Sequence, residues 1–124
     1  MGDIDDPLIL LVDDDPQILR ATGRLLEHRG FRVATTSHPF EVTKLVRELH
    51  PSAVVLDVNM PALGGEALSG FLHKHIGEGL PIVFYSGLHE AELRRLSADR
   101  EGVTYACKGA GPNVLIERLR AVTG

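Results

Sequence analysis

The sequence has few of the features that mark secreted or membrane-bound proteins. It contains one cysteine, Cys107, so an intramolecular disulfide and a cysteine-based zinc cluster are both excluded. No apolar run approaches the roughly 20 residues that a membrane-spanning helix needs. Residues 1–7 are acidic and lack the basic-then-apolar order of a signal peptide. We therefore expect a soluble protein of the cytoplasm without membrane contacts.

The sequence also lacks an excess of positive charge. Its 13 lysines and arginines face 17 aspartates and glutamates, which gives a net charge of −4 with histidine neutral. This balance disfavours binding to nucleic-acid phosphates, so no direct nucleic-acid contact is expected. The apolar share of 44% argues against disorder, and 124 residues suit one compact domain. We expect a single domain over residues 1–124, with its core at about residues 8–122.

Short apolar runs alternate with helical patterns along the chain. Apolar runs predict buried strands at residues 7–12, 53–56 and 81–85. Two further strands are expected at residues 31–36, where the end is β-branched, and at residues 103–107. Apolar residues at helical spacing predict helices at residues 16–29, 39–50, 66–76, 90–96 and 112–122. Helical crossovers join neighbouring strands that run parallel in a sheet. The sequence therefore predicts an α/β fold, a doubly wound five-stranded parallel sheet with helices on both faces.

Local signals predict where the first two helices begin and end. Asp15 followed by Pro16 is typical of an N-cap and a first helical residue. Gly30 is expected to end the first helix in a left-handed conformation. The second helix is predicted to bury an apolar stripe of Val42, Leu45, Val46 and Leu49.

Chemically active side chains follow four of the five predicted strands. They are Asp13 and Asp14 after the first, Asp57 after the third, Ser86 after the fourth and Lys108 after the fifth. In an open parallel sheet, ligands bind beyond the carboxyl ends of the strands. We therefore expect these side chains to gather at one edge of the sheet.

The chemistry of such a group can be stated in advance. Two carboxylates about 5 Å apart repel by about 3 kcal/mol at an effective dielectric near 20. Clustered acids therefore protonate, move apart or bind a cation, and oxygen ligands alone favour a hard cation such as Mg²⁺. Lys108 supplies a positive charge and Ser86 a hydroxyl that suit a phosphoryl group. A carboxylate can also attack phosphorus and form an acyl phosphate.

Four segments of the chain carry a resemblance to a known family. They are LLVDDDP at residues 10–16, VLDVNMP at 55–61 with Gly65 following, FYSG at 84–87 and YACK at 105–108. Together they make the chain similar to the receiver domain of bacterial two-component response regulators. The resemblance covers residues 8–122 and implies the flavodoxin-like fold with strand order 2-1-3-4-5.

The resemblance implies a phosphoacceptor and a metal site. Asp57 matches the residue that accepts a phosphoryl group from a sensor histidine kinase or a phosphotransfer protein. Asp14 and Asp57 match direct Mg²⁺ ligands, together with the backbone carbonyl of Asn59. Asp13 matches an acid that acts on the metal indirectly. The resemblance implies no enzyme activity other than catalysis of the domain's own phosphorylation and dephosphorylation.

The resemblance also implies a switch and an output surface. Ser86 matches the switch hydroxyl, and Lys108 matches the lysine that contacts the phosphoryl group. Tyr105 matches the aromatic residue whose rotamer follows the switch. The implied output is binding of an unknown protein or domain to the face formed by helix 90–96, strand 103–107 and helix 112–122.

One departure from the family pattern keeps alternatives open. Gly109 follows Lys108, where the family usually has proline, and glycine leaves the backbone less restrained. One alternative is a pseudo-receiver, an interaction module that works through a fixed surface without phosphorylation. Another is a small phosphatase that forms an aspartyl phosphate on Asp13, with Asp15 as the acid two residues later.

Overall fold

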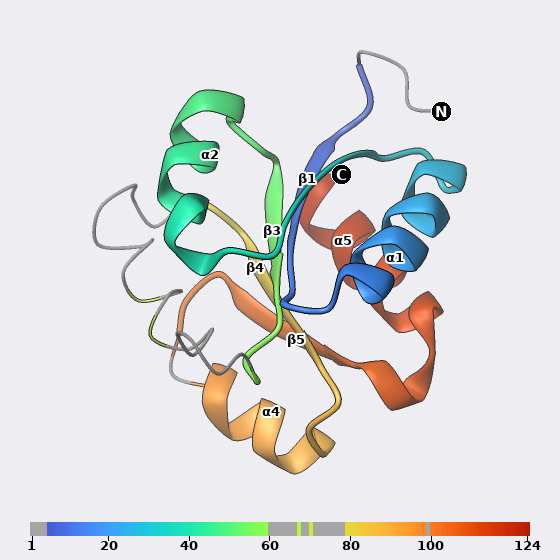
Figure 1. The fold of residues 1–124 in the computed structure, drawn as a ribbon. Coiled ribbons are helices and arrows are strands. Elements are labelled where there is room, and N and C mark those ends of the chain that lie inside the picture. Colours follow the sequence, from blue (N-terminus) through green and yellow to red (C-terminus); the bar gives the residue numbers. More distant parts are fainter. Residues whose placement is uncertain (1–4, 60–66, 68–69, 71–78, 99) are drawn as a thin grey trace.

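Five parallel strands form one sheet in the computed structural model, and helices cover both of its faces (Figure 1). The structure describes residues 5–59, 67, 70, 79–98 and 100–124. The strand order is β2-β1-β3-β4-β5, which confirms the predicted topology. The strands are β1 (Leu8–Val12), β2 (Arg32–Thr36), β3 (Ala53–Leu56), β4 (Ile82–Ser86) and β5 (Val103–Cys107).

Four helices and two short 3₁₀ turns accompany the strands in the described part of the chain. The helices are α1 (Pro16–His28), α2 (Val42–Leu49), α4 (Glu90–Ser97) and α5 (Pro112–Thr123), and the turns are η1 (Pro39–Glu41) and η2 (Lys108–Ala110). The helix predicted at 66–76 lies outside the described residues, apart from positions 67 and 70. Among the described residues, no helix is long and apolar enough to cross a membrane.

Each strand supplies side chains to two cores, one on each face of the sheet. In β1, Ile9 and Leu11 pack with α1 and α5, whereas Leu10 and Val12 pack with α2 and α4. All four of these side chains are buried. Burial on both faces is why β1, β3 and β4 have continuous apolar runs and not alternating ones. The same burial leaves the ends of the strands as the place where polar side chains can gather.

The ends of α1 follow the sequence signals. Asp15 has extended backbone angles, and its Oδ1 accepts a hydrogen bond from the backbone N–H of Gln17 at 2.9 Å. This bond satisfies one of the N–H groups that a helix start leaves open. Gly30 has a φ of 93°, in the left-handed region that glycine tolerates. Both predicted ends are therefore confirmed.

The start of the second helix and one of its buried residues differ from the prediction. The segment begins as the 3₁₀ turn η1, and regular α-helix starts only at Val42. Leu49 is 39% exposed, so the prediction that it is buried was wrong. The helix ends at this residue because His50 turns into the left-handed region at a φ of 49°. Periodicity alone does not reveal that the last residue of this helix is exposed.

Candidate functional site

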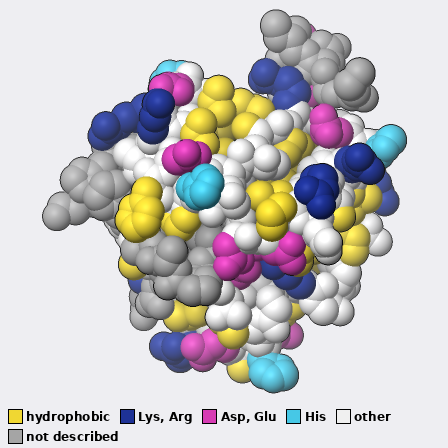
Figure 2. Space-filling view, viewed as in Figure 1, with side chains coloured by type: hydrophobic (Ala, Val, Ile, Leu, Met, Phe, Trp, Pro, Cys, Tyr) yellow, Lys and Arg dark blue, Asp and Glu magenta, His cyan; other side chains and the backbone are white. Residues whose placement is uncertain are grey.

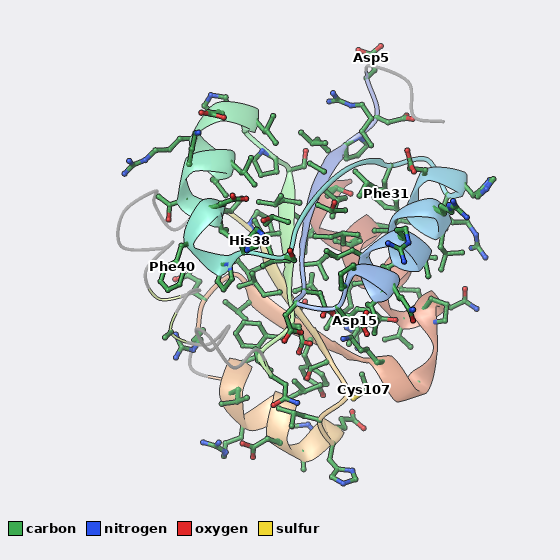
Figure 3. The ribbon with its side chains drawn as sticks, in the orientation of Figure 1. Asp5, Asp15, Phe31, His38, Phe40 and Cys107 are labelled. Carbon is green, nitrogen blue, oxygen red and sulfur yellow. The ribbon has the colours of Figure 1, made fainter. Side chains whose placement is uncertain are left out.

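The sheet ladder continues through two aspartates beyond the ends of β1 and β3. The backbone N–H of Asp13 donates to the carbonyl of Thr36 at 3.3 Å, and that of Asp57 donates to the carbonyl of Val12 at 3.0 Å. Both aspartates are buried. These bonds hold the backbones of the two aspartates at the carboxyl edge of the sheet. In Figure 3 this is the lower edge, where Asp15 and Cys107 are labelled.

Lys108 joins these two aspartates into one cluster. Its Nζ donates to Asp13 Oδ2 at 2.7 Å and to Asp57 Oδ2 at 3.2 Å. The side chains of Lys108, Asp13 and Asp57 are only 19%, 7% and 9% exposed. We call these three residues the acid–lysine cluster. It comes from the ends of three strands, as the sequence predicts, although the lysine lies 95 residues from Asp13.

The second carboxylate oxygen of each aspartate is bound to the backbone. Asp13 Oδ1 accepts from the N–H of Asp15 at 3.0 Å, and Asp57 Oδ1 accepts from the N–H of Asn59 at 2.9 Å. Each buried carboxylate therefore has a backbone donor on one oxygen and the Lys108 ammonium on the other. Charged groups with this many partners are held in a fixed orientation.

Asp14 adds a third acid to this edge. One carboxylate oxygen from each of Asp13, Asp14 and Asp57 lies within 4.8 Å of the others. Asp14 is exposed, so its side chain is open to solvent while the other two are buried. Figure 2 shows acidic side chains gathered at the centre of this face, next to basic ones. Oxygen donors of this kind at this spacing fit a hard divalent cation such as Mg²⁺.

Burial and charge shift the pKa values of two members of the acid–lysine cluster. Burial raises the pKa of the Asp13 carboxyl above its usual value, and hydrogen bonds from Lys108 and from the Asp15 backbone offset part of that rise. Burial alone would lower the pKa of Lys108, but bonding to Asp13 and the charges of Asp57 and Asp13 raise it overall. Lys108 therefore remains a full positive charge at neutral pH.

Ser86 and Tyr105 form their hydrogen bonds outside the acid–lysine cluster. Ser86 is completely buried, and its Oγ accepts from the N–H of Leu88 at 3.3 Å. The half-buried Tyr105 donates its hydroxyl proton to Glu90 Oε1 at 3.1 Å and accepts from Arg94 Nε at 3.3 Å. Tyr105 is thus bonded to α4. We call Glu90, Arg94 and Tyr105 the α4 network.

Comparison with known proteins identifies the family. The sequence model of the response regulator receiver domain matches residues 9–120. The chain belongs to this family. It is a receiver domain of the two-component type, which favours neither the pseudo-receiver nor the phosphatase alternative.

Individual relatives agree with the family assignment. The receiver is 33% identical to protein RcaC of Microchaete diplosiphon, over 92% of this chain and 18% of that protein. It is 31% identical to the transcriptional regulatory protein KdpE of Mycobacterium tuberculosis, over 92% of this chain and 50% of that protein. The chain thus spans half or less of the length of these curated relatives.

Solved structures share the fold of this receiver. A LuxR-family two-component response regulator from Aurantimonas matches with a TM-score of 0.86 at 24% identity, over 96% of this chain and 86% of that one. A CheY-like receiver domain protein from Methanospirillum hungatei matches with a TM-score of 0.82 at 25% identity, over 94% and 93%. The strand order of the receiver fold is therefore shown independently of the sequence pattern.

Sequence reasoning assigned no role to two parts of this receiver. The Tyr85 ring lies beside Lys108, with the ammonium 5.8 Å from the ring centroid. Glu90 and Arg94, the partners of Tyr105, were expected only as residues of the helix predicted at 90–96. Tyr85 directly precedes Ser86 on a predicted strand, which was the one available signal. The partners of Tyr105 depend on how α4 packs on β5, and no local pattern reports that packing.

Proposed function

We propose that this receiver domain, a single domain over residues 1–124 with its core at about 8–122, accepts a phosphoryl group on Asp57. The observation that carries this proposal is the double contact of Lys108 with Asp13 and Asp57, beside the third acid Asp14. Asp57 follows the central strand β3 and has an acid on one side and a cation within 3.2 Å. The donor is the phosphohistidine of a sensor histidine kinase or a phosphotransfer protein.

The transfer requires little covalent chemistry from the protein. A carboxylate oxygen of Asp57 attacks phosphorus and forms an O–P bond, while the P–N bond of the donor breaks. The imidazole leaves with the electron pair of that bond and takes up a proton. Catalysis of such a transfer is mainly positioning and stabilisation of developing negative charge. Hydrolysis of the acyl phosphate by water then resets the domain.

Several groups around Asp57 each stabilise part of the negative charge on the phosphoryl oxygens. A Mg²⁺ ion held by Asp14, Asp57 and the backbone carbonyl of Asn59, with Asp13 acting indirectly, would neutralise phosphoryl oxygens. Lys108 pairs with a phosphoryl oxygen and Ser86 donates its hydroxyl proton to another. The three acids that now lie within 4.8 Å of one another support this division, because their negative charges need a cation.

The output of the domain is a change of surface. A phosphoryl group draws the Ser86 hydroxyl toward Asp57, and Tyr105 moves into the space that Ser86 leaves. Tyr105 must then release Glu90 and Arg94, and exposed charged contacts of this kind are weak. The face of α4, β5 and α5 changes shape and binds an output protein or domain. We expect the domain in the cytoplasm, with no direct contact to nucleic acid.

The geometry of Asp15 argues against the phosphatase alternative. That enzyme would need Asp13 as nucleophile and Asp15 as a general acid beside it. Asp15 instead caps α1 by accepting from Gln17, and its own N–H binds Asp13. The Asp15 carboxylate is therefore engaged by the backbone of α1 and not by Asp13.

Phosphorylation by a small donor tests the proposal. Acetyl phosphate with Mg²⁺ should add one phosphoryl group to the wild type, seen by intact mass spectrometry, and none to Asp57→Asn. The matched control is Asp15→Asn, which removes the same charge from the same edge and should label like the wild type. Equal labelling of Asp57→Asn would contradict the assignment.

A further inference from the structure

The ring of Tyr85 is the third contact of the Lys108 ammonium. Lys108 Nζ lies 5.8 Å from the ring centroid, within the distance at which a cation is attracted to an aromatic face. Tyr85 is 8% exposed and the Lys108 side chain 19% exposed. Water screens this contact little, and such contacts are stronger when desolvated.

Tyr85 forms part of the wall of the candidate site. It comes from β4, the strand between β3 and β5, so it lies between the strands that carry Asp57 and Lys108. Tyr85 and Asp13 also line the same small cavity of about 10 Å³. The ring therefore borders the acid–lysine cluster on the side of α1 and α5, where Tyr85 belongs to the apolar core.

Lys108 carries its ammonium on a flexible four-carbon stem, which the backbone of a short turn does not fix by itself. Lys108 starts the short 3₁₀ turn η2 and is followed by Gly109, the residue type with the greatest backbone freedom. Among the described residues, no heavy atom lies within 4 Å of the place that a Cβ at Gly109 would take. The position of the ammonium is therefore set by what its far end contacts.

The three contacts of the ammonium differ in how they respond to phosphorylation. The contacts with Asp13 and Asp57 depend on the charges of those carboxylates. Phosphorylation converts the Asp57 carboxylate into an acyl phosphate, so Lys108 then faces a phosphoryl oxygen in place of Oδ2, and a bound cation would compete with Lys108 for Asp13. The Tyr85 ring is neutral and keeps its attraction for the ammonium in every state of the site. It is the one contact that does not change when the reaction proceeds.

We infer that Tyr85 is a positioning residue that holds the Lys108 ammonium at the phosphoryl site. The inference rests on the proposed function, because it concerns the reaction at Asp57. Tyr85 acts through Lys108 and does not touch the reacting atoms. Its aromatic ring is required and its hydroxyl is not.

Ring-preserving and ring-removing variants test this inference. Tyr85→Phe should accept phosphate from acetyl phosphate at close to the wild-type rate at saturating Mg²⁺. Tyr85→Leu and Tyr85→Met should each be slower by about fivefold to thirtyfold, the range from an exposed to a desolvated cation–ring contact. Val83→Ala is the matched control, because it removes apolar volume from the same face of β4 and should leave the rate unchanged. Wild-type rates in both non-aromatic variants would overturn the inference.

A double-mutant cycle separates positioning from packing. In the Lys108→Ala background, Tyr85→Leu should cause no further slowing, because the ring acts only through the lysine. Slowing by the same factor in both backgrounds would show that Tyr85 acts through packing, and the inference would be wrong.

A measurement without phosphate distinguishes this inference from the proposed function. The side-chain methylene resonance of Lys108 next to the ammonium should be shifted by the ring current in the wild type and in Tyr85→Phe, and should return to its ordinary position in Tyr85→Leu. An unchanged resonance in Tyr85→Leu overturns the inference even if Asp57 is labelled. A wild type that shows the shift but takes no phosphate overturns the proposed function alone.

Discussion

Two groups of charged side chains on this receiver have similar chemistry and very different surroundings. The acid–lysine cluster pairs a cation with two carboxylates whose side chains are less than 10% exposed. On α4, Arg94 pairs with Glu90 and Arg95 with Glu92, at side-chain exposures between 45% and 66%. The first group lies where strand ends meet, and the second lies on the outer face of a helix.

Burial decides what each group can do. In the acid–lysine cluster, burial raises the pKa of Asp13 and strengthens each charge interaction, so removing one member affects the others. On α4, solvent screens the pairs, and each contributes little to stability. A weak surface group is suited to letting Tyr105 move, whereas a strong buried group is suited to holding a phosphoryl group.

Lys108→Ala should have the largest effect on stability. It leaves the buried Asp13 and Asp57 without their cation, at a cost of about 2 kcal/mol, less than for a fully buried charge because Lys108 is 19% exposed. Urea unfolding in the absence of metal measures this loss, and Mg²⁺ should restore part of it. Arg95→Ala, which breaks an exposed pair, is the control and should leave the unfolding midpoint unchanged. Equal losses of stability in Lys108→Ala and Arg95→Ala would show that burial does not make the acid–lysine cluster stronger than the surface pairs.

Asp14→Ala should weaken Mg²⁺ binding by about tenfold or more, because a site with few protein oxygens depends on each charged ligand. The same change should stabilise the metal-free protein, because it relieves repulsion within the acid group. Calorimetric titration and urea unfolding give the two results. Asp15→Asn removes a charge one residue away while keeping a good N-cap, so it should bind Mg²⁺ like the wild type. Unchanged affinity in Asp14→Ala would contradict the metal assignment.

Asp13→Asn should change the pH dependence of stability. Because burial raises the pKa of Asp13 in the folded protein, the folded state binds this proton more tightly than the unfolded chain. The stability that the protonated form provides is therefore lost as the pH rises through the raised pKa. The variant lacks this loss, so its stability relative to the wild type should increase as the pH rises above about 4. Urea unfolding of the metal-free proteins at several pH values measures the sign of this change. A decrease in the relative stability of Asp13→Asn would show that Lys108 lowers the pKa of Asp13 by more than burial raises it.

Glu90→Gln should have the smallest effect on stability and a visible effect on Tyr105. The change weakens the acceptor of the Tyr105 hydroxyl and the ion pair of Arg94, both on the solvent side of α4. The unfolding midpoint should not move resolvably. The Tyr105 amide resonance should move part of the way toward its position in the wild type with beryllofluoride, a phosphoryl mimic. If the Tyr105 resonance moves neither in Glu90→Gln nor on addition of beryllofluoride, this residue takes no part in switching.

The backbone of the site follows from the sequence, because apolar runs that end in aspartate place those aspartates at the sheet edge. Asp13 and Asp57 needed only the strand positions and the parallel topology to be brought together. The cap at Asp15 was equally local, since it depends on Gln17, two residues away. These features follow from periodicity and short-range hydrogen bonding.

The side-chain contacts that complete the site could not be obtained in this way. Lys108 reaches Asp13 across 95 residues of sequence, and the freedom of Gly109 gave no reason to expect a fixed position. The contact of Lys108 with Tyr85 depends on the register of β4 and β5, in which Tyr85 pairs with Ala106. Tyr105 meets α4 through the packing of one exposed helix face. Each of these contacts depends on tertiary geometry at the scale of one side chain.

The central claim is that Asp57 is the side chain that accepts the phosphoryl group. Borohydride reduces an aspartyl phosphate to homoserine, so reduction after labelling with acetyl phosphate and Mg²⁺ marks the acceptor permanently. Peptide mass spectrometry should then find homoserine at position 57 and unmodified aspartate at positions 13, 14 and 15. Homoserine at any of those three positions, or aspartate throughout in a labelled protein, would contradict the account.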